Sequence, residues 1–404
     1  MTSPNSKLAA SVCAPASAFD LLQWQEQAQA HTALWRSESS LPKPRRIEVA
    51  DDTMPADTAF RHISEGASLL WRGDFQNARQ LLLALGRRLD KKSRRKSPAK
   101  SPAAAGFPHA FHLYRQSQAQ RARMLGSILI ELDVQWHCAL RRAPDWSQAC
   151  SEAWGTVPAE VHAQSVLVPL RDLLGVVGAH EWRKKGVEIP ALDGARIHAH
   201  YGVFSPVRGE YLDLVARASI PAAGIQQAWD IGVGTGVLSA LLLKRGVKSV
   251  VATDTSERAL ACACENLQRL GHASRVELQH ADLFAQGQAG LIVCNPPWLP
   301  GKAASVLDQA IYDEDSRMLR GFLQGLAAHL LPGGEGWLII SDLAEHLKLR
   351  TRDELLGWIE AAGLKVLGRE DVRPHHGKVQ DREDPLHIAR SAEVTSLWRL
   401  AKAG

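Results

Sequence analysis

The second half of the chain is organised around the stretch Ala228-Trp-Asp-Ile-Gly-Val-Gly-Thr-Gly-Val237. Asp230 ends a short apolar segment that predicts a β-strand, and a helix over 237–245 follows the loop directly. Glycine has no Cβ atom, so alternating glycines let the backbone turn sharply and let a ligand lie against it. The loop glycines are Gly232, Gly234 and Gly236. A dinucleotide fingerprint needs G-x-G-x-x-G, but Val237 takes its last position, which argues against a nicotinamide or flavin site.

Further carboxylates follow at the ends of the next predicted strands. The apolar segment Ser249–Thr253 leads into Asp254, roughly 20 residues after the loop, where a carboxylate can bind both hydroxyl groups of a ribose. A third predicted strand leads into Asp282 and Leu283. In an open parallel sheet, ligands bind in the crevice outside the carboxyl ends of the strands. We therefore expect Asp230, Asp254 and Asp282 to face one crevice.

The segment Asn295-Pro296-Pro297-Trp298 follows the continuous apolar run Gly290–Cys294, which is typical of a buried parallel strand. Two prolines cannot continue the hydrogen bonding of a sheet, so the chain must turn away and expose Asn295. The Asn295 side-chain oxygen and the Pro296 carbonyl can each accept an N–H, and Trp298 offers a flat face for stacking. Alone, these residues would also fit a loop that merely ends a strand. Together with the glycine loop they predict a site for a planar –NH2 group.

These elements, in this order, resemble the class I S-adenosylmethionine-dependent methyltransferases, specifically the small-domain branch that carries N-P-P-aromatic. The resemblance covers roughly residues 203–400. It implies that the loop 230–236 holds the methionine part of S-adenosylmethionine, that Asp254 holds the ribose, and that Asp282-Leu283 contacts the adenine. It also implies that Asn295–Trp298 binds the nitrogen to be methylated, with Asn295 bordering the cofactor. The expected fold is a Rossmann-like, doubly wound α/β domain with a seven-stranded sheet.

Two positions depart from the family pattern, and neither removes a functional group. Val233 occupies a variable place in the loop, and Trp298 stands where Tyr or Phe is commoner. The sulfonium supplies an activated methyl group, so the protein mainly has to position the reactants, and no metal or general base is required. His198 and His200 alternate on a predicted strand without a third ligand, and we predict no metal site there.

The segment His198–Tyr211 resembles the part of the same family that precedes the glycine loop and covers the cofactor. Our lid candidates are Phe204, Pro206 and Arg208. An ordinary strand and turn that pack on the sheet is the alternative. Downstream, predicted helices at 315–331 and 351–362 alternate with strands, and the last strand, 393–400, is expected to run antiparallel. We place the catalytic domain at 187–404.

The N-terminal half has a different character. We read 1–54 as a flexible leader and 55–186 as a mainly α-helical domain, because apolar residues recur at helical spacing over 59–86 and 121–140. Between these segments, 87–106 is rich in Lys, Arg, Ser and Pro, and it predicts a flexible basic loop. Such a loop can attract phosphates and give salt-sensitive affinity for nucleic acid, although a solvated linker would look the same.

Whole-chain properties are those of a two-domain cytoplasmic enzyme. The chain has 404 residues, a hydrophobic fraction of 45% and a formal net charge of +5, which permits an anionic partner without requiring one. No apolar run reaches the roughly 20 residues of a membrane span. The segment 7–18 is reminiscent of a signal peptide, but Pro15 interrupts its core, and S-adenosylmethionine is made in the cytoplasm. The sequence does not define the oligomeric state.

Three hypotheses remain for the target. The first is an exocyclic amine of a base in nucleic acid, RNA above all, supported by the basic segment and by Trp298 as a stacking surface. The second is a glutamine amide in a translation-related protein, as in the release-factor methyltransferases, which share N-P-P-aromatic. The third is a module that binds a cofactor or RNA without catalysis; it would usually show a damaged motif, and this motif is intact.

Overall fold

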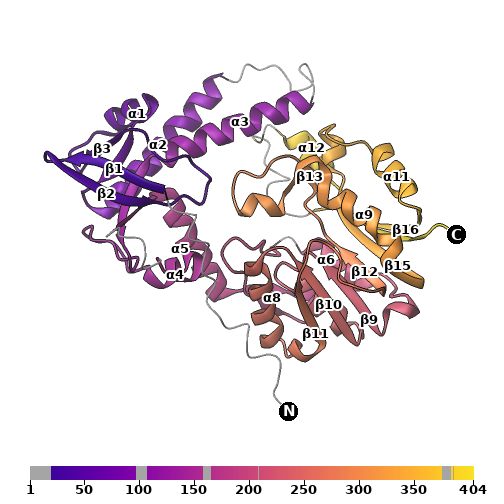
Figure 1. Cartoon of the computed structure of the whole chain (residues 1–404). Coiled ribbons are helices and arrows are strands. Elements are labelled where there is room, and N and C mark those ends of the chain that lie inside the picture. Colours follow the sequence, from indigo (N-terminus) through magenta and orange to yellow (C-terminus); the bar gives the residue numbers. More distant parts are fainter. Residues whose placement is uncertain (1–19, 97–106, 158–164, 208, 375–383, 385) are drawn as a thin grey trace, which may run out of the picture. The chain divides into compact units, whose positions relative to one another are not determined.

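The computed structural model describes residues 20–96, 107–157, 165–207, 209–374, 384 and 386–404. The described residues form two compact units, one from those within 1–101 and 115–181 and the other from those within 102–114 and 182–404 (Figure 1). The second unit thus begins near residue 182, slightly before the predicted boundary at 187. It also includes the described residues of 102–114, which no sequence pattern predicts.

The second unit is built on a seven-stranded sheet in the order β11-β10-β9-β12-β15-β17-β16, and Figure 1 shows β11, β10, β9 and β12 side by side. All neighbouring strands from β11 to β15 pair in parallel, whereas β17 is antiparallel to both β15 and β16. The strands are β9 (Gln227–Ile231), β10 (Ser249–Asp254), β11 (Val276–His280), β12 (Ala289–Cys294), β15 (Leu330–Ser341), β16 (Leu364–Val372) and β17 (Thr395–Lys402). The predicted doubly wound sheet with an antiparallel last strand is confirmed.

Helices cover both faces of this sheet, as alternating strands and helices predict. They are α6 (Glu210–Arg217), α7 (Val237–Lys244), α8 (Glu257–Arg269), α9 (Arg317–His329) and α11 (Arg352–Ala361). The short helices α10 (Leu343–His346) and α12 (His387–Ala392) pack in a separate apolar cluster that also contains Leu299. One apolar core cluster contains residues of α6, α7, α8 and the sheet. A second cluster contains residues of α9, α11 and other positions of the sheet. Two short strand pairs complete the unit: β7 (Val187–Ile189) with β8 (Ala195–Ile197), and β13 (Leu299–Pro300) with β14 (Tyr312–Asp313).

Strand β12 explains the position of the site. All six of its residues are buried, as expected for a central strand covered on both faces. Its neighbour β9 pairs with it so that Val293 lies opposite Asp230, and Asp230 in turn lies opposite Ala252 of β10. The loops that leave β9, β10 and β12 therefore begin at the same edge of the sheet.

The first unit contains a six-stranded sheet in the order β1-β2-β6-β5-β4-β3. Its strands are β1 (Asp20–Glu26), β2 (Gln29–Trp35), β3 (Ile47–Ala50), β4 (Ser68–Trp71), β5 (Ile128–Asp133) and β6 (Ser165–Pro169). Its helices are α1 (Ala56–Ser64), α2 (Phe75–Lys96) and α4 (Ser147–Trp154), together with most of α3 (Phe107–Leu125) and α5 (Leu170–Lys185).

The sequence predicts a mainly helical domain here, and the structure adds this sheet to the helices. Strands β4 and β5 fall inside segments that read as helical, because a short apolar run looks alike in a buried strand and a buried helix. The prediction of a flexible leader is wrong for 20–50, which carries β1 to β3. The β1–β2 turn places Gln27 and Ala28 at positive φ without the usual Asn or Gly, so it gives no turn signal.

The predicted basic loop is also partly helical. Residues 87–96 continue α2, and the rest of the predicted loop, 97–106, lies outside the described residues. Arg, Lys and Leu are good helix formers, so a dense run of positive charge does not by itself end a helix. Within the described part of the chain, no helix is both long enough and apolar enough to cross a membrane.

Candidate active site

The glycine loop connects β9 to α7 and needs glycine at three places. Its three glycines all have positive φ, a conformation that side chains with a Cβ rarely adopt: Gly232, Gly234 and Gly236. A Cβ on Gly236 would lie 3.2 Å from the Cβ of Ala263 on α8, so this glycine also allows close helix packing. The amides of Gly232 and Val233 both donate to the Thr253 carbonyl at 2.9 Å, which fixes the loop to β10.

Asp230, at the end of β9, fixes the helix that follows the glycine loop. Its Oδ2 accepts hydrogen bonds from the Ser239 amide (3.0 Å) and the Ser239 hydroxyl (2.6 Å), and both residues are fully buried. Burial raises the pKa of Asp230 to about 7. Its other oxygen, Oδ1, has no hydrogen-bond partner among the described residues. A buried carboxylate of this kind ties the first turn of α7 to the end of β9.

Asp254, at the end of β10, contacts the loop from the side. Its Oδ2 accepts from the Gly234 amide at 3.1 Å, and its Oδ1 accepts from the Ser256 amide at 2.9 Å. Burial raises the pKa of Asp254, and hydrogen bonds to backbone amides act in the opposite direction. The carboxylate thus joins the glycine loop to the start of α8, for which Ser256 is the N-cap.

Asp282 and Leu283 follow β11. Asp282 forms an ion pair with Arg317 at 3.0 Å, and both side chains are largely exposed. This pairing raises the pKa of Arg317. Leu283 has a positive φ of 71°, and its carbonyl accepts a hydrogen bond from the Thr253 hydroxyl, so the turn at Leu283 is fixed to β10.

The segment Asn295–Trp298 leaves β12 as predicted, but its two side chains bind each other. The indole N–H of Trp298 donates to Asn295 Oδ1 at 2.9 Å. Trp298 is half-buried and packs against both core clusters of the sheet. A carbonyl oxygen has two lone pairs, so one acceptor position on Asn295 is still available to a ligand. Trp298 therefore orients Asn295, a contact that the sequence analysis did not predict.

A cavity of about 480 Å³ brings most of the predicted residues together. This volume lies in the usual range for a site that binds one small ligand. The predicted residues that line it are Phe204, Gly232, Gly234, Asp254, Asp282, Leu283, Asn295, Pro296, Pro297 and Trp298. Asp230, Gly236 and Pro206 do not line it; the first two lie behind the glycine loop. Arg208 lies outside the described residues.

Several cavity residues were not predicted from the sequence. They come from β14, α10, the region of α12 and α3: Tyr312, Leu343, Arg390, Glu393 and Tyr114. Leu343 shares an apolar cluster with Leu299, the residue after Trp298, and Tyr114 and Tyr312 pack against that cluster. Glu393 is buried and accepts a hydrogen bond from the Ser341 hydroxyl at 2.7 Å. None of these residues belongs to a sequence motif, so only the fold reveals them.

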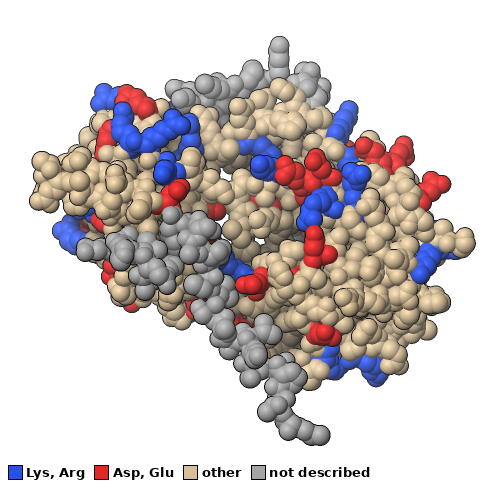
Figure 2. Space-filling model, in the orientation of Figure 1, with Lys and Arg blue, Asp and Glu red and all other residues tan. Residues whose placement is uncertain are grey.

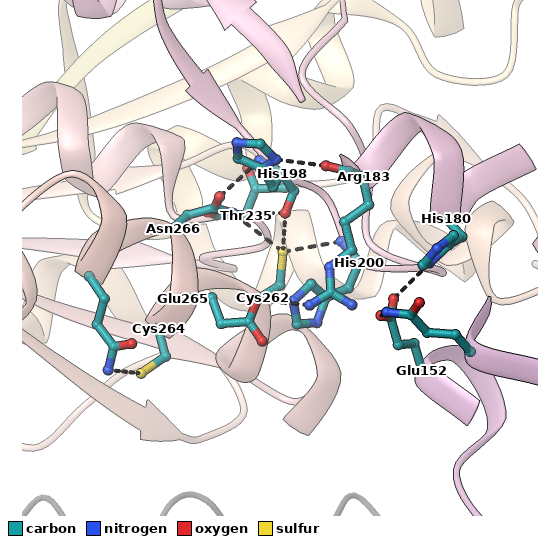
Figure 3. Close-up of polar contacts among 12 residues, drawn as sticks. Glu152, His180, Arg183, His198, His200, Thr235, Cys262, Cys264, Glu265 and Asn266 are labelled. Atoms are coloured by element: carbon teal, nitrogen blue, oxygen red, sulfur yellow. Dashed lines mark hydrogen bonds and ion pairs between the residues drawn. The ribbon is translucent and has the colours of Figure 1, made fainter. Parts of the chain in front are cut away.

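The segment that carries the lid candidate Phe204 is held to α8 by a buried asparagine (Figure 3). Asn266 Oδ1 accepts from the His198 amide at 2.8 Å, and its Nδ2 lies 3.2 Å from the His198 carbonyl and 3.1 Å from the Thr235 carbonyl. Asn266 therefore links this segment to the glycine loop. His200 lies 3.1 Å from Glu265, and the described residues include no group of three or more His, Cys, Asp or Glu arranged to hold a metal ion.

Comparison with known proteins shows what the part of the chain that lines the cavity is similar to. Residues 194–352 match the sequence family described as the methyltransferase small domain. This match begins before the glycine loop and ends after β15, so it includes Asp254 and Asn295–Trp298. The resemblance to class I methyltransferases of the small-domain branch is confirmed for this part of the chain.

Three curated relatives illustrate the range of known targets. The release factor glutamine methyltransferase of Cereibacter sphaeroides is 34% identical over 149 residues, which are 33% of this chain and 51% of the relative. A putative protein N5-glutamine methyltransferase of Methanocaldococcus jannaschii is 28% identical over 185 residues, 43% of this chain and 91% of the relative. The tRNA1(Val) (adenine(37)-N6)-methyltransferase of Vibrio cholerae is 32% identical over 124 residues, 26% of this chain and 51% of the relative.

The chain spans about half the length of two of these three relatives. The family match itself leaves out the first unit, α3 and α12. Two of these names specify a methylated nitrogen, N5 of a glutamine and N6 of an adenine, and the third names a glutamine.

Proposed function

We propose that this protein is an S-adenosylmethionine-dependent N-methyltransferase that methylates a planar –NH2 group, specifically an exocyclic amine of a base in RNA. One observation carries the proposal. The glycine loop and Asp254, on one side, and Asn295–Trp298, on the other, line the same cavity. This shared cavity supports a nucleoside site beside a site for a planar nitrogen, as transfer between two bound reactants would require.

The residues around the glycine loop fit the cofactor. Three loop glycines at positive φ carry no Cβ atom, which leaves room for a ligand beside the backbone. Gly232 and Gly234 would hold the methionine part, Asp254 the ribose, and Asp282 with Leu283 the adenine. Bound S-adenosylmethionine would supply a methyl group already activated on its sulfonium. Asp230 and Gly236 would act indirectly, by fixing the loop and the first turn of α7.

The residues after β12 fit the acceptor. The free lone pair of Asn295 Oδ1 and the carbonyl of Pro296 would each accept one N–H of the target –NH2 group. Two acceptors in fixed positions would hold the nitrogen so that its lone pair points toward the methyl group. Trp298 would keep Asn295 in this orientation through its indole N–H, whose bond to Oδ1 is 2.9 Å long.

A base is the favoured acceptor because aromatic side chains surround Asn295. Trp298 and Tyr312 both line the cavity there, and flat rings of this kind bind bases by stacking. On the face shown in Figure 2, Lys and Arg are interspersed with Asp and Glu. The basic end of α2, where Arg88 pairs with Asp57 and Lys91 is exposed, would add affinity for phosphates.

A glutamine amide in a translation-related protein is the second candidate. The relatives from Cereibacter sphaeroides and Methanocaldococcus jannaschii carry glutamine methyltransferase names. A primary amide presents the same planar –NH2 geometry to Asn295 as a base amine does. For either acceptor, we place the reaction in the cytoplasm, where S-adenosylmethionine is made.

The deciding experiment follows a tritiated methyl group from S-adenosylmethionine into extract of cells that lack this gene. The extract is then separated into RNA, DNA, protein and small molecules, and the Asn295→Ala variant serves as the control. Label that ribonuclease removes would support the proposal. Label in a protein band would replace it with the glutamine candidate, and no label in any fraction would indicate a binding module without catalysis.

The basic end of α2 has its own test. Exchanging Lys91 and Arg94 together for Glu should weaken RNA binding and reduce its dependence on salt, because fewer counterions are released on binding. Filter binding at several salt concentrations measures both quantities. Unchanged affinity and salt dependence would remove this segment from the proposed RNA-binding surface.

A further inference from the structure

The acceptor end of the cavity is completed by a helix far from the methyltransferase match in sequence. The match begins at residue 194, whereas Tyr114, on α3, lines the same cavity as Asn295 and Trp298. Residues 102–114 belong to the second compact unit, so this part of α3 is a component of the catalytic unit itself.

The first turns of α3 are firmly attached to that unit. Phe111 is only 2% exposed, and it lies in a compact apolar cluster with residues from β13, α10 and α12: Leu299, Leu343, Ala344, Leu347, Leu386 and Ala389. Tyr114 follows Phe111 by three positions, so the two side chains share one face of the helix. Tyr114 packs against the cluster while also lining the cavity. Its ring is therefore held in place at the cavity wall.

The same cluster fixes the position of Tyr114 relative to the acceptor residues. Leu299, a member of the cluster, directly follows Trp298, and it pairs with Tyr312 in the register of β13 and β14. Tyr312 also packs on the cluster and lines the cavity. Three aromatic side chains thus converge on the acceptor end, and one of them comes from α3.

We propose that Tyr114 is a specificity-determining residue, whose ring forms a wall of the acceptor site and contacts the flat face of the base being methylated. This inference rests on the proposed function, since it presumes a base as acceptor. Stacking of one base on one aromatic ring changes affinity by about tenfold or more when the ring is removed. Because α3 lies outside the family match, the resemblance to that family does not imply this contact.

The test compares full-length variants in methyl transfer to total RNA and to total protein from cells that lack the gene. Rates are measured against acceptor concentration at saturating S-adenosylmethionine. Tyr114→Ala and Tyr114→Leu should lower kcat/KM for RNA about tenfold, because both remove the ring. Tyr114→Phe should stay close to the wild type, because it keeps the ring. Leu113→Ala is the matched control, since Leu113 is the neighbouring residue of the same helix and its side chain is exposed.

A second readout separates this role from a general loss of structure. The dissociation constant for S-adenosylhomocysteine, measured by calorimetry, should stay within about twofold of the wild type in every variant, because the cofactor residues are unchanged. Unaltered kcat/KM for RNA in both ring-removing variants would overturn the inference, and so would an equal loss in Leu113→Ala. A wild-type enzyme that binds S-adenosylhomocysteine but labels only protein, or no fraction, would instead refute the proposed RNA acceptor, and this inference with it.

Discussion

Replacing Asp254 by Ala should separate cofactor binding from the rest of the site. In the structure, its two oxygens accept hydrogen bonds from the amides of Gly234 and Ser256 at 3.1 and 2.9 Å. The proposed ribose contacts would use its remaining lone pairs. Hydrogen bonds to a charged group contribute about 1.5–3 kcal/mol each, so losing two of them would cost roughly 3 kcal/mol or more. We expect the dissociation constant for S-adenosylhomocysteine to rise about 100-fold, at roughly 1.4 kcal/mol per factor of ten.

Isothermal titration calorimetry measures this constant directly and needs no acceptor. The matched control is Asp193→Ala, because the Asp193 side chain is 84% exposed and pairs with Lys244 away from the cavity residues. A dissociation constant within about twofold of the wild type in Asp254→Ala would refute the ribose assignment. Burial raises the pKa of Asp254, so on acidification this carboxylate becomes protonated at a higher pH than an ordinary aspartate does. The affinity for S-adenosylhomocysteine should therefore begin to fall at that higher pH.

Three further predictions concern the acceptor residues and the loop. Asn295→Ala should keep the affinity for S-adenosylhomocysteine and lose most turnover, measured as methyl transfer to RNA; calorimetry that showed lost cofactor binding would contradict the assignment. Trp298→Phe keeps an aromatic ring but removes the N–H that donates to Asn295. Because such a hydrogen bond contributes roughly 1 kcal/mol, kcat should fall about five- to tenfold. An unchanged kcat would show that Asn295 does not need this hydrogen bond. Asp230 has a folded-state pKa of about 7, above its unfolded value, so its contribution to stability is complete below about pH 4 and is lost as the pH rises through about 7. Urea unfolding should therefore show a smaller fall in stability between pH 4 and 7 for Asp230→Asn than for the wild type, and equal falls would contradict the raised pKa.

The sheet of the catalytic unit could be predicted because its signals are local. The loop glycines, the acids after the strands and the proline pair after β12 each mark a strand end within a few residues. The strand β12 is fully buried, so its apolar run is continuous and easily recognised. The bond between Trp298 and Asn295 could not be predicted, because the direction of a side chain after a turn depends on the packing around it.

The strands of the first unit could not be predicted from the sequence in this way. Its strands are short, and β4, with four buried residues, cannot be told from a turn of buried helix by periodicity. Strand β1 has alternating burial, with Leu22 and Trp24 inward, but polar residues dominate it and its turn lacks glycine. Tertiary pairing, as of β1 with β2, therefore decides the structure where local preference is weak.

The cavity is lined by residues from inside and from outside the family match. The proposed cofactor residues Gly234 and Asp254 lie inside the family match, whereas Tyr114 and Arg390, which line the same cavity, lie outside it. Relatives that share only the matched part can share the chemistry without sharing the target. Under the proposed function, methyl transfer to nitrogen would be the property that this chain shares with them, and the choice of acceptor would depend on α3 and α12. Removing the Tyr114 ring should for that reason lower methyl transfer to RNA without changing how the cofactor binds.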